Sequence, residues 1–80
     1  HMEPFFVEIL PESAREKKLS SHEGEEFIAV IKGSIEIRYG QETQILNEGD
    51  SAYYNSIVPH YVSCAGEEKA EIHAVIYIPE

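Results

Sequence analysis

Three side chains of the metal-ligand type, His22, Glu26 and His60, stand out in the sequence. His22 and Glu26 lie four residues apart around Gly24, at the start of an expected strand. Alternate residues of a strand share a face, so Glu26 and the apolar Ile28 point to the same side. A carboxylate on an apolar face is costly unless it binds a metal, another cation or hydrogen-bond donors. With His60, the set of two imidazoles and one carboxylate predicts a facial site for Fe, Mn, Ni or Zn with open positions for water.

Spacing alone leaves a second interpretation open, in which His22 is a solvated side chain of a glutamate-rich loop. Tyr54 and Tyr61 are candidates to line a ligand pocket, although tyrosines in strands also pack in cores and interfaces with the hydroxyl at the rim. We interpret His73 as a structural histidine. Cys64 is interpreted as a small buried hydrophobe, which needs no chemical role.

The elements that must position these residues are short strands separated by turn signals, with almost no helical periodicity. Residues 34–39 alternate between polar and apolar side chains, the pattern of an antiparallel strand with one wet face. Strands are expected at residues 5–9, 25–32, 35–39, 42–46, 51–54, 60–65 and 69–78, and a loop at 12–18. This rhythm predicts an all-β fold, a small antiparallel sandwich or barrel.

Length and charge limit the number of domains and the classes of partner. The chain has 80 residues, which is enough for one domain and no more. Six Lys and Arg against 15 Asp and Glu give a net charge of −9, which argues against contact of this domain with nucleic acid or an anionic membrane surface. No apolar run is long enough to span a membrane. The single cysteine, Cys64, excludes an internal disulfide, and a cytoplasmic protein is the default expectation. A thin core and exposed strand edges favour a homodimer.

The first two residues, His1 and Met2, have the pattern left by a cleaved affinity tag and a start codon. We therefore interpret residues 1–2 as a cloning remnant and residues 3–80 as a single domain. The abrupt start at Glu3 fits a domain excised from a longer protein.

The order of the candidate ligands resembles the two motifs of the cupins. His22, three residues, Glu26, six residues and Gly33 follow the first motif. The Gly-Asp turn at residues 49–50, followed after a gap by the Pro-His pair at residues 59–60, follows the second motif. The stretch between the motifs, residues 34–48, is as short as in the most compact cupins. The resemblance covers residues 4 to 79, nearly the whole chain.

The resemblance implies an antiparallel β-barrel of the jelly-roll type, with one divalent metal in its mouth in many members. His22, Glu26 and His60 match three of the four ligand positions of the family. The fourth differs, because the first histidine of the usual His-x-His falls on Ser20. The asparagine that often follows the second-motif histidine falls on Cys64.

Within the cupins, the chain is similar to the sensor domains attached to a helix-turn-helix in bacterial transcription regulators. This similarity implies a small-molecule-sensing regulatory domain that dimerises, with the effector bound among Glu26, Tyr54, His60 and Tyr61. We prefer this sensor to an enzyme. The alternatives are a metal-dependent cupin enzyme of dioxygenase or isomerase type, and a regulatory cupin fused to an enzyme. A module whose barrel is filled with side chains is a third interpretation.

Overall fold

The computed structural model describes residues 1–11 and 19–79. These residues form strands and turns without an α-helix, so the expected all-β class is confirmed. None of them belongs to a helix long and apolar enough to cross a membrane. The loop expected at residues 12–18 lies outside the described residues. The strands are β1 (Met2–Ile9), β2 (Glu25–Lys32), β3 (Ser34–Tyr39), β4 (Glu42–Asn47), β5 (Ser51–Asn55), β6 (His60–Cys64) and β7 (Ala70–Tyr77).

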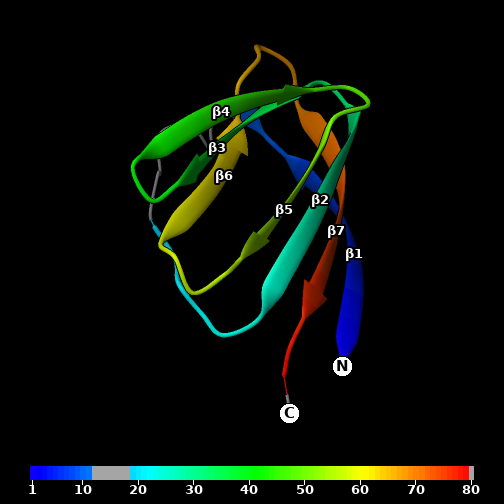
Figure 1. The fold of residues 1–80 in the computed structure, drawn as a ribbon. Helices are drawn as coiled ribbons and strands as arrows, with labels where there is room; N and C mark the ends of the chain where they lie inside the picture. Colours follow the sequence, from blue (N-terminus) through cyan, green and yellow to red (C-terminus); the bar gives the residue numbers. More distant parts are fainter. Residues whose placement is uncertain (12–18, 80) are drawn as a thin grey trace.

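Two sheets face each other, and the two ends of the chain lie at the same end of the molecule (Figure 1). One sheet has the strand order β1-β7-β2-β5, and the other has the order β4-β3-β6. Every strand pairing is antiparallel. The pairing of β2 with β7 and of β3 with β6 means that the chain crosses between the sheets, as in a jelly roll. The expected small jelly-roll barrel is therefore confirmed.

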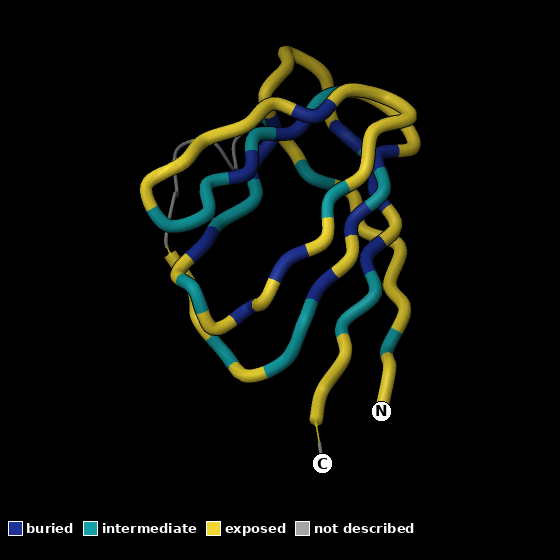
Figure 2. Tube along the Cα trace, in the orientation of Figure 1, coloured by how far each residue is buried: buried dark blue, intermediate teal, exposed yellow. Residues whose placement is uncertain are grey.

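Buried residues alternate with more exposed ones along several strands (Figure 2), and the buried apolar residues form one core cluster between the sheets. Ile28 and Val30 of β2 and Ile35 and Ile37 of β3 belong to this cluster. Leu46, Cys64, Ala70, Ile72 and Ala74 complete the buried apolar cluster with Tyr54. Because Glu26 precedes Ile28 by two residues, the same alternation places its carboxylate on the inner face of β2.

The turn before β2 depends on Gly24, which adopts a φ of 113°. A Cβ atom at this position would lie 2.1 Å from the carbonyl oxygen of Tyr77 in β7. The Gly24 carbonyl also accepts a hydrogen bond from the backbone N–H of Ser56 at 2.9 Å. Glycine therefore allows the chain to pass closely beside β7 between His22 and Glu26.

Replacement of Gly24 by alanine tests this constraint against Gly49, which has a φ of 91° and open space around it. Both substitutions place a side chain at positive φ, which costs about 1–2 kcal/mol. Gly24→Ala adds the clash with Tyr77, so we expect its free energy of unfolding to fall by a further ~1–3 kcal/mol. Urea unfolding of the two variants measures the difference, and equal losses would contradict the close approach to β7.

Candidate metal centre

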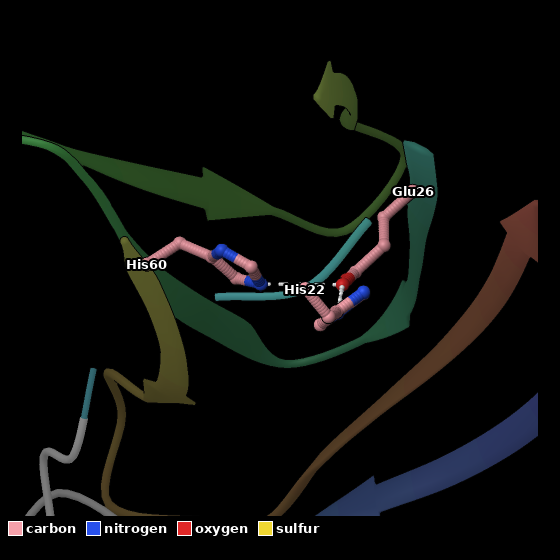
Figure 3. A group of neighbouring side chains, drawn as sticks. All are labelled: His22, Glu26 and His60. Carbon is pink, nitrogen blue, oxygen red and sulfur yellow. Dashed lines mark hydrogen bonds and ion pairs between the residues drawn. The ribbon is translucent and has the colours of Figure 1, made fainter. Parts of the chain in front are cut away.

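His22, Glu26 and His60 come together at one end of the inner face of the barrel (Figure 3). Glu26 belongs to β2, His60 is the first residue of β6, and His22 lies in the segment before β2. The side chain of His60 is 4% exposed and that of Glu26 is 11% exposed, whereas that of His22 is 41% exposed. One ligand atom from each residue lies within 4.8 Å of the other two. The structure thus gathers the three residues that the sequence spacing singled out.

Backbone pairing holds the His22 segment in place. Ser20 and His60 form an isolated antiparallel bridge, in which Ser20 N donates to His60 O at 2.7 Å and His60 N donates to Ser20 O at 2.9 Å. His22 N donates to the carbonyl of Ser56 at 3.1 Å. The Ser21 hydroxyl donates to the carbonyl of Ile57 at 2.6 Å. The segment is therefore fixed to β6 and to the loop after β5.

Ser20 has a structural role at the position where the cupin motif usually has a histidine. Its hydroxyl lies 3.4 Å from the carbonyl oxygen of His60 and donates to it. It accordingly supports the strand that carries one candidate ligand.

The Glu26 carboxylate accepts hydrogen bonds on both oxygens. Oε1 lies 2.8 Å from His22 Nε2 and 3.2 Å from both His60 Nε2 and the hydroxyl of Ser56. Oε2 accepts the hydroxyl proton of Tyr54 at 2.7 Å. These donors offset the desolvation of a carboxylate beside an apolar core.

In both imidazole rings, Nδ1 contacts a backbone carbonyl. His60 Nδ1 donates to the carbonyl of Val58 at 2.8 Å, and His22 Nδ1 donates to the carbonyl of Glu23 at 3.2 Å. A carbonyl oxygen only accepts, so the proton at each of these contacts belongs to Nδ1. Each ring therefore presents Nε2 to Glu26, either as a second N–H donor or, after loss of that proton, as a lone pair.

Burial and hydrogen bonding set the charge of the acidic groups. Burial alone raises the pKa of the Glu26 carboxyl, but Tyr54, His60, His22 and Ser56 together lower this pKa below its ordinary value. Burial, followed by the hydrogen bond to Glu26, raises the pKa of Tyr54 above its ordinary value. Glu26 is therefore an anion at neutral pH, and Tyr54 keeps the proton that it donates.

The donor set fits a divalent metal ion. Ligand atoms that bind one metal at about 2.1 Å, with a right angle between them, lie about 3 Å apart. The two Nε2–Oε1 distances, 2.8 and 3.2 Å, match this separation. The Nδ1–H bonds to backbone carbonyls fix the tautomer that leaves Nε2 for a metal, as outer-shell partners of metal-bound histidines do.

Of the four residues expected to bind a small ligand, the structure gathers Glu26, Tyr54 and His60. The Tyr54 ring lies 5.1 Å from that of His60 between centroids. Tyr61 is not brought to the cluster, because it follows His60 directly and points to the other face of the sheet. Its hydroxyl donates to Glu36 at 2.8 Å.

The sequence reasoning missed Ser56, which is fully buried and donates to Glu26. Ser56 lies in the loop after β5, where no strand alternation indicates the direction of a side chain.

The fold and the site define a small jelly-roll barrel with two imidazoles and a carboxylate gathered at one end of its interior. The family model named Cupin domain matches residues 5–77, and the chain belongs to this family. No curated protein matches the sequence significantly.

Solved structures are similar over nearly the whole chain. Hydroxypropylphosphonic acid epoxidase from S. wedmorenis is 29% identical with a TM-score of 0.84, covering 95% of this chain and 43% of that one. The structure of FeII HppE gives the same values. An HTH_3 family transcriptional regulator from Vibrio cholerae is 22% identical with a TM-score of 0.83, covering 99% of this chain and 44% of that one. The chain thus spans less than half the length of these proteins, and the similarity to the regulator shows the fold alone.

The substitution Tyr54→Phe tests the hydrogen bond that holds Glu26. A lowered carboxyl pKa contributes stability above its unfolded value, and this stability is lost as the pH falls through the folded value. Without the Tyr54 hydroxyl, the pKa of Glu26 in the folded protein rises, so the stability that this group loses on acidification becomes smaller and its loss is complete at a higher pH. We also expect a loss of about 1–3 kcal/mol in the free energy of unfolding at neutral pH.

Carboxyl ¹³C NMR titration and urea unfolding between acid and neutral pH measure both effects. Tyr53→Phe is the matched control, because the neighbouring Tyr53 is exposed and bonds Glu25 on the outer face. A Glu26 titration curve that is unchanged in Tyr54→Phe would contradict the assignment.

Proposed function

We propose that this cupin domain binds one divalent metal ion, iron(II) in first preference, through His22, Glu26 and His60. The observation that carries the proposal is the convergence of His22 Nε2, Glu26 Oε1 and His60 Nε2 within 4.8 Å. Two histidines and one carboxylate with open positions are typical of non-haem iron(II) sites. The iron(II) form of HppE, 29% identical over 95% of this chain, supports the same metal. The net charge of −9 favours the uptake of any cation.

Several residues around the cluster would orient the ligand atoms of such a site. A bound divalent iron supplies Lewis-acid and oxygen-activating chemistry. Val58 orients the ring of His60 by accepting its Nδ1 proton. Tyr54 holds Oε2 of Glu26 and so leaves Oε1 for the metal. Because His60 and Glu26 are nearly buried while His22 is exposed, the open side of the site lies towards His22.

We place a metal-dependent enzyme of the oxygenase type ahead of the effector sensor that the sequence favoured. The histidine rings are already oriented for metal binding, which an effector site without metal does not require. Sensing of a small molecule at the same site is the second candidate. The resemblance of four stretches to regulator-linked cupins supports it, at residues 22–27, 30–33, 49–56 and 58–61.

Metal content tests the proposal directly. We expect the purified protein to take up about one equivalent of Fe(II), or of Co(II) as a coloured substitute, with visible absorption from nitrogen and oxygen ligation. His22→Ala, His60→Ala and Glu26→Gln each remove a ligand, so each weakens binding by more than about 100-fold, the upper range for loss of an outer-shell partner.

His73→Ala is the matched control. His73 lies exposed on β7, where its ring contacts Phe6, and it takes no part in the cluster. Plasma mass spectrometry and Co(II) absorption give the readouts, with circular dichroism to confirm that each variant is folded. Equal metal content in His60→Ala and the parent protein would overturn the proposal. Oxygen consumption by the iron-loaded protein with candidate substrates then separates an enzyme from a sensor.

We also propose that the chain forms a homodimer through the outer face of the sheet β1-β7-β2-β5. One row of directly paired residues crosses all four strands of this sheet without a charge, because Pro4, Val75, Phe27 and Tyr53 face outward together. Phe6 and Tyr77 extend this exposed apolar surface. Two copies that each carry a charge of −9 repel each other least where they meet across uncharged residues.

Phe27→Glu places a carboxylate in the middle of this face, so we expect the variant to be a monomer. Ile45→Glu is the control, since Ile45 is similarly exposed on β4 of the other sheet. Sedimentation velocity over a range of concentrations measures the state of association. A parent protein that stays monomeric, or a dimer unaffected by Phe27→Glu, would contradict this interface.

A further inference from the structure

The strand β4 has polar side chains where its neighbours have core residues. Directly paired residues share a face, so Leu46, Gln44 and Glu42 of β4 point inward with Ile35, Ile37 and Tyr39 of β3. Leu46 is buried, as expected for an inward position. Gln44 and Glu42 are exposed even though they point inward, whereas the apolar Ile45 points outward into solvent. This reversal of the usual pattern requires an explanation in terms of the barrel interior.

A cavity explains the reversal. A hollow of about 610 Å³ opens between β3, β4 and β5, and this volume suits a small organic molecule. Gln44 and Glu42 are exposed because they line this hollow. Its wall also includes Ile37, Ala52, Tyr39 and Tyr54.

The groups that remain available in the cavity are few. The Tyr54 hydroxyl donates to the Glu26 carboxylate, and the Tyr39 hydroxyl donates to the carbonyl of Asn55 at 3.1 Å. The two rings lie 5.4 Å apart between centroids with their planes at 55°. Within residues 1–11 and 19–79, no hydrogen bond or ion pair engages the Glu42 carboxylate or the Gln44 amide.

We propose that this cavity selects a small organic cation, such as a primary amine attached to an aromatic or aliphatic body. The Glu42 carboxylate pairs with the ammonium group, and the Gln44 amide oxygen accepts a second hydrogen bond from it. The faces of Tyr39 and Tyr54 contact the cation or its apolar body. None of the described lining residues is Lys, Arg or His, so an organic anion finds no cationic partner there and meets the charge of Glu42.

The inference goes beyond the proposed metal site. None of His22, Glu26 and His60 lines the cavity, and Tyr54 is the residue that connects the two. A ligand in the cavity would therefore contact Tyr54 without contacting the three candidate metal ligands. Binding in the cavity is expected with or without metal.

Three probes of the same shape test the charge selection: benzylamine, benzyl alcohol and benzoate. They are titrated into the ¹⁵N-labelled protein with a chelator present, and backbone amide shifts are followed by NMR. We expect saturable shifts at Gln44, Ala52 and Tyr54 with benzylamine. It should bind about fivefold more tightly than benzyl alcohol, as one partly exposed ion pair implies, and benzoate more weakly than either.

Glu42→Gln is expected to abolish the preference for benzylamine over benzyl alcohol while leaving the alcohol unaffected. Glu48→Gln is the matched control. Glu48 lies in the exposed turn after β4, so this substitution removes the same charge at a position away from the cavity. If Glu48→Gln removes the preference equally, the selection comes from net charge and the proposal fails. It also fails if benzoate binds as well as benzylamine, if none of the probes gives saturable shifts, or if the shifts fall on the outer face around Val75 and Tyr77.

The chelator keeps this result separate from the metal proposal. A metal site that fails in the uptake experiment leaves the titration with benzylamine unchanged. A cavity that shows no charge preference leaves the metal stoichiometry unchanged.

Discussion

The burial of one carboxylate, that of Glu26, is the constraint on which the site depends. Strand alternation places Glu26 on the same face as Ile28 and the core. Its carboxylate must therefore bind hydrogen-bond donors or cations inside the barrel. The partners come from separate parts of the chain: His22 before β2, Tyr54 on β5, Ser56 in the loop after it and His60 on β6. A change in any of these segments therefore reaches Glu26, which couples both sheets and the segment before β2.

The interior changes from apolar to polar along the strands. At one end, Ile35 and Leu46 are paired across β3 and β4, and Cys64 pairs with Ile35 from β6. At the other end, the corresponding row contains Tyr39, Glu42 and His60. The sheet containing β2 has the same gradient, from Val30 and Ile72 to Glu26 and Tyr54. The apolar end closes the barrel by packing, and the candidate metal ligands and part of the cavity wall lie at the polar end.

Strand positions could be predicted because turn signals bound the strands and because residues 34–39 alternate between polar and apolar side chains. The expected 25–32 matches β2, and the other expected strands differ from the observed ones by a few residues at their ends. The ligand triad was identified because its order along the chain matches a family motif. Tyr61 was expected in the pocket, although strand alternation places the side chains of Tyr61 and His60 on opposite faces of the sheet. Ser56 had no such signal, since its direction depends on the loop, whose hydrogen bonds to Gly24 and His22 form only in the folded barrel.

The cluster of His22, Glu26 and His60 has the orientation that the proposed metal site would require. Both rings are held through Nδ1, both Nε2 atoms point at Oε1, and the lowered pKa of Glu26 keeps the carboxylate charged. A divalent cation at the proposed site would be held by Nε2 of His22, Oε1 of Glu26 and Nε2 of His60. Tyr54 binds the other oxygen of Glu26, Oε2, and would keep this contact with a cation at Oε1. Since its ring also forms a wall of the cavity, the position of Glu26 and the shape of the cavity are set by the same side chain.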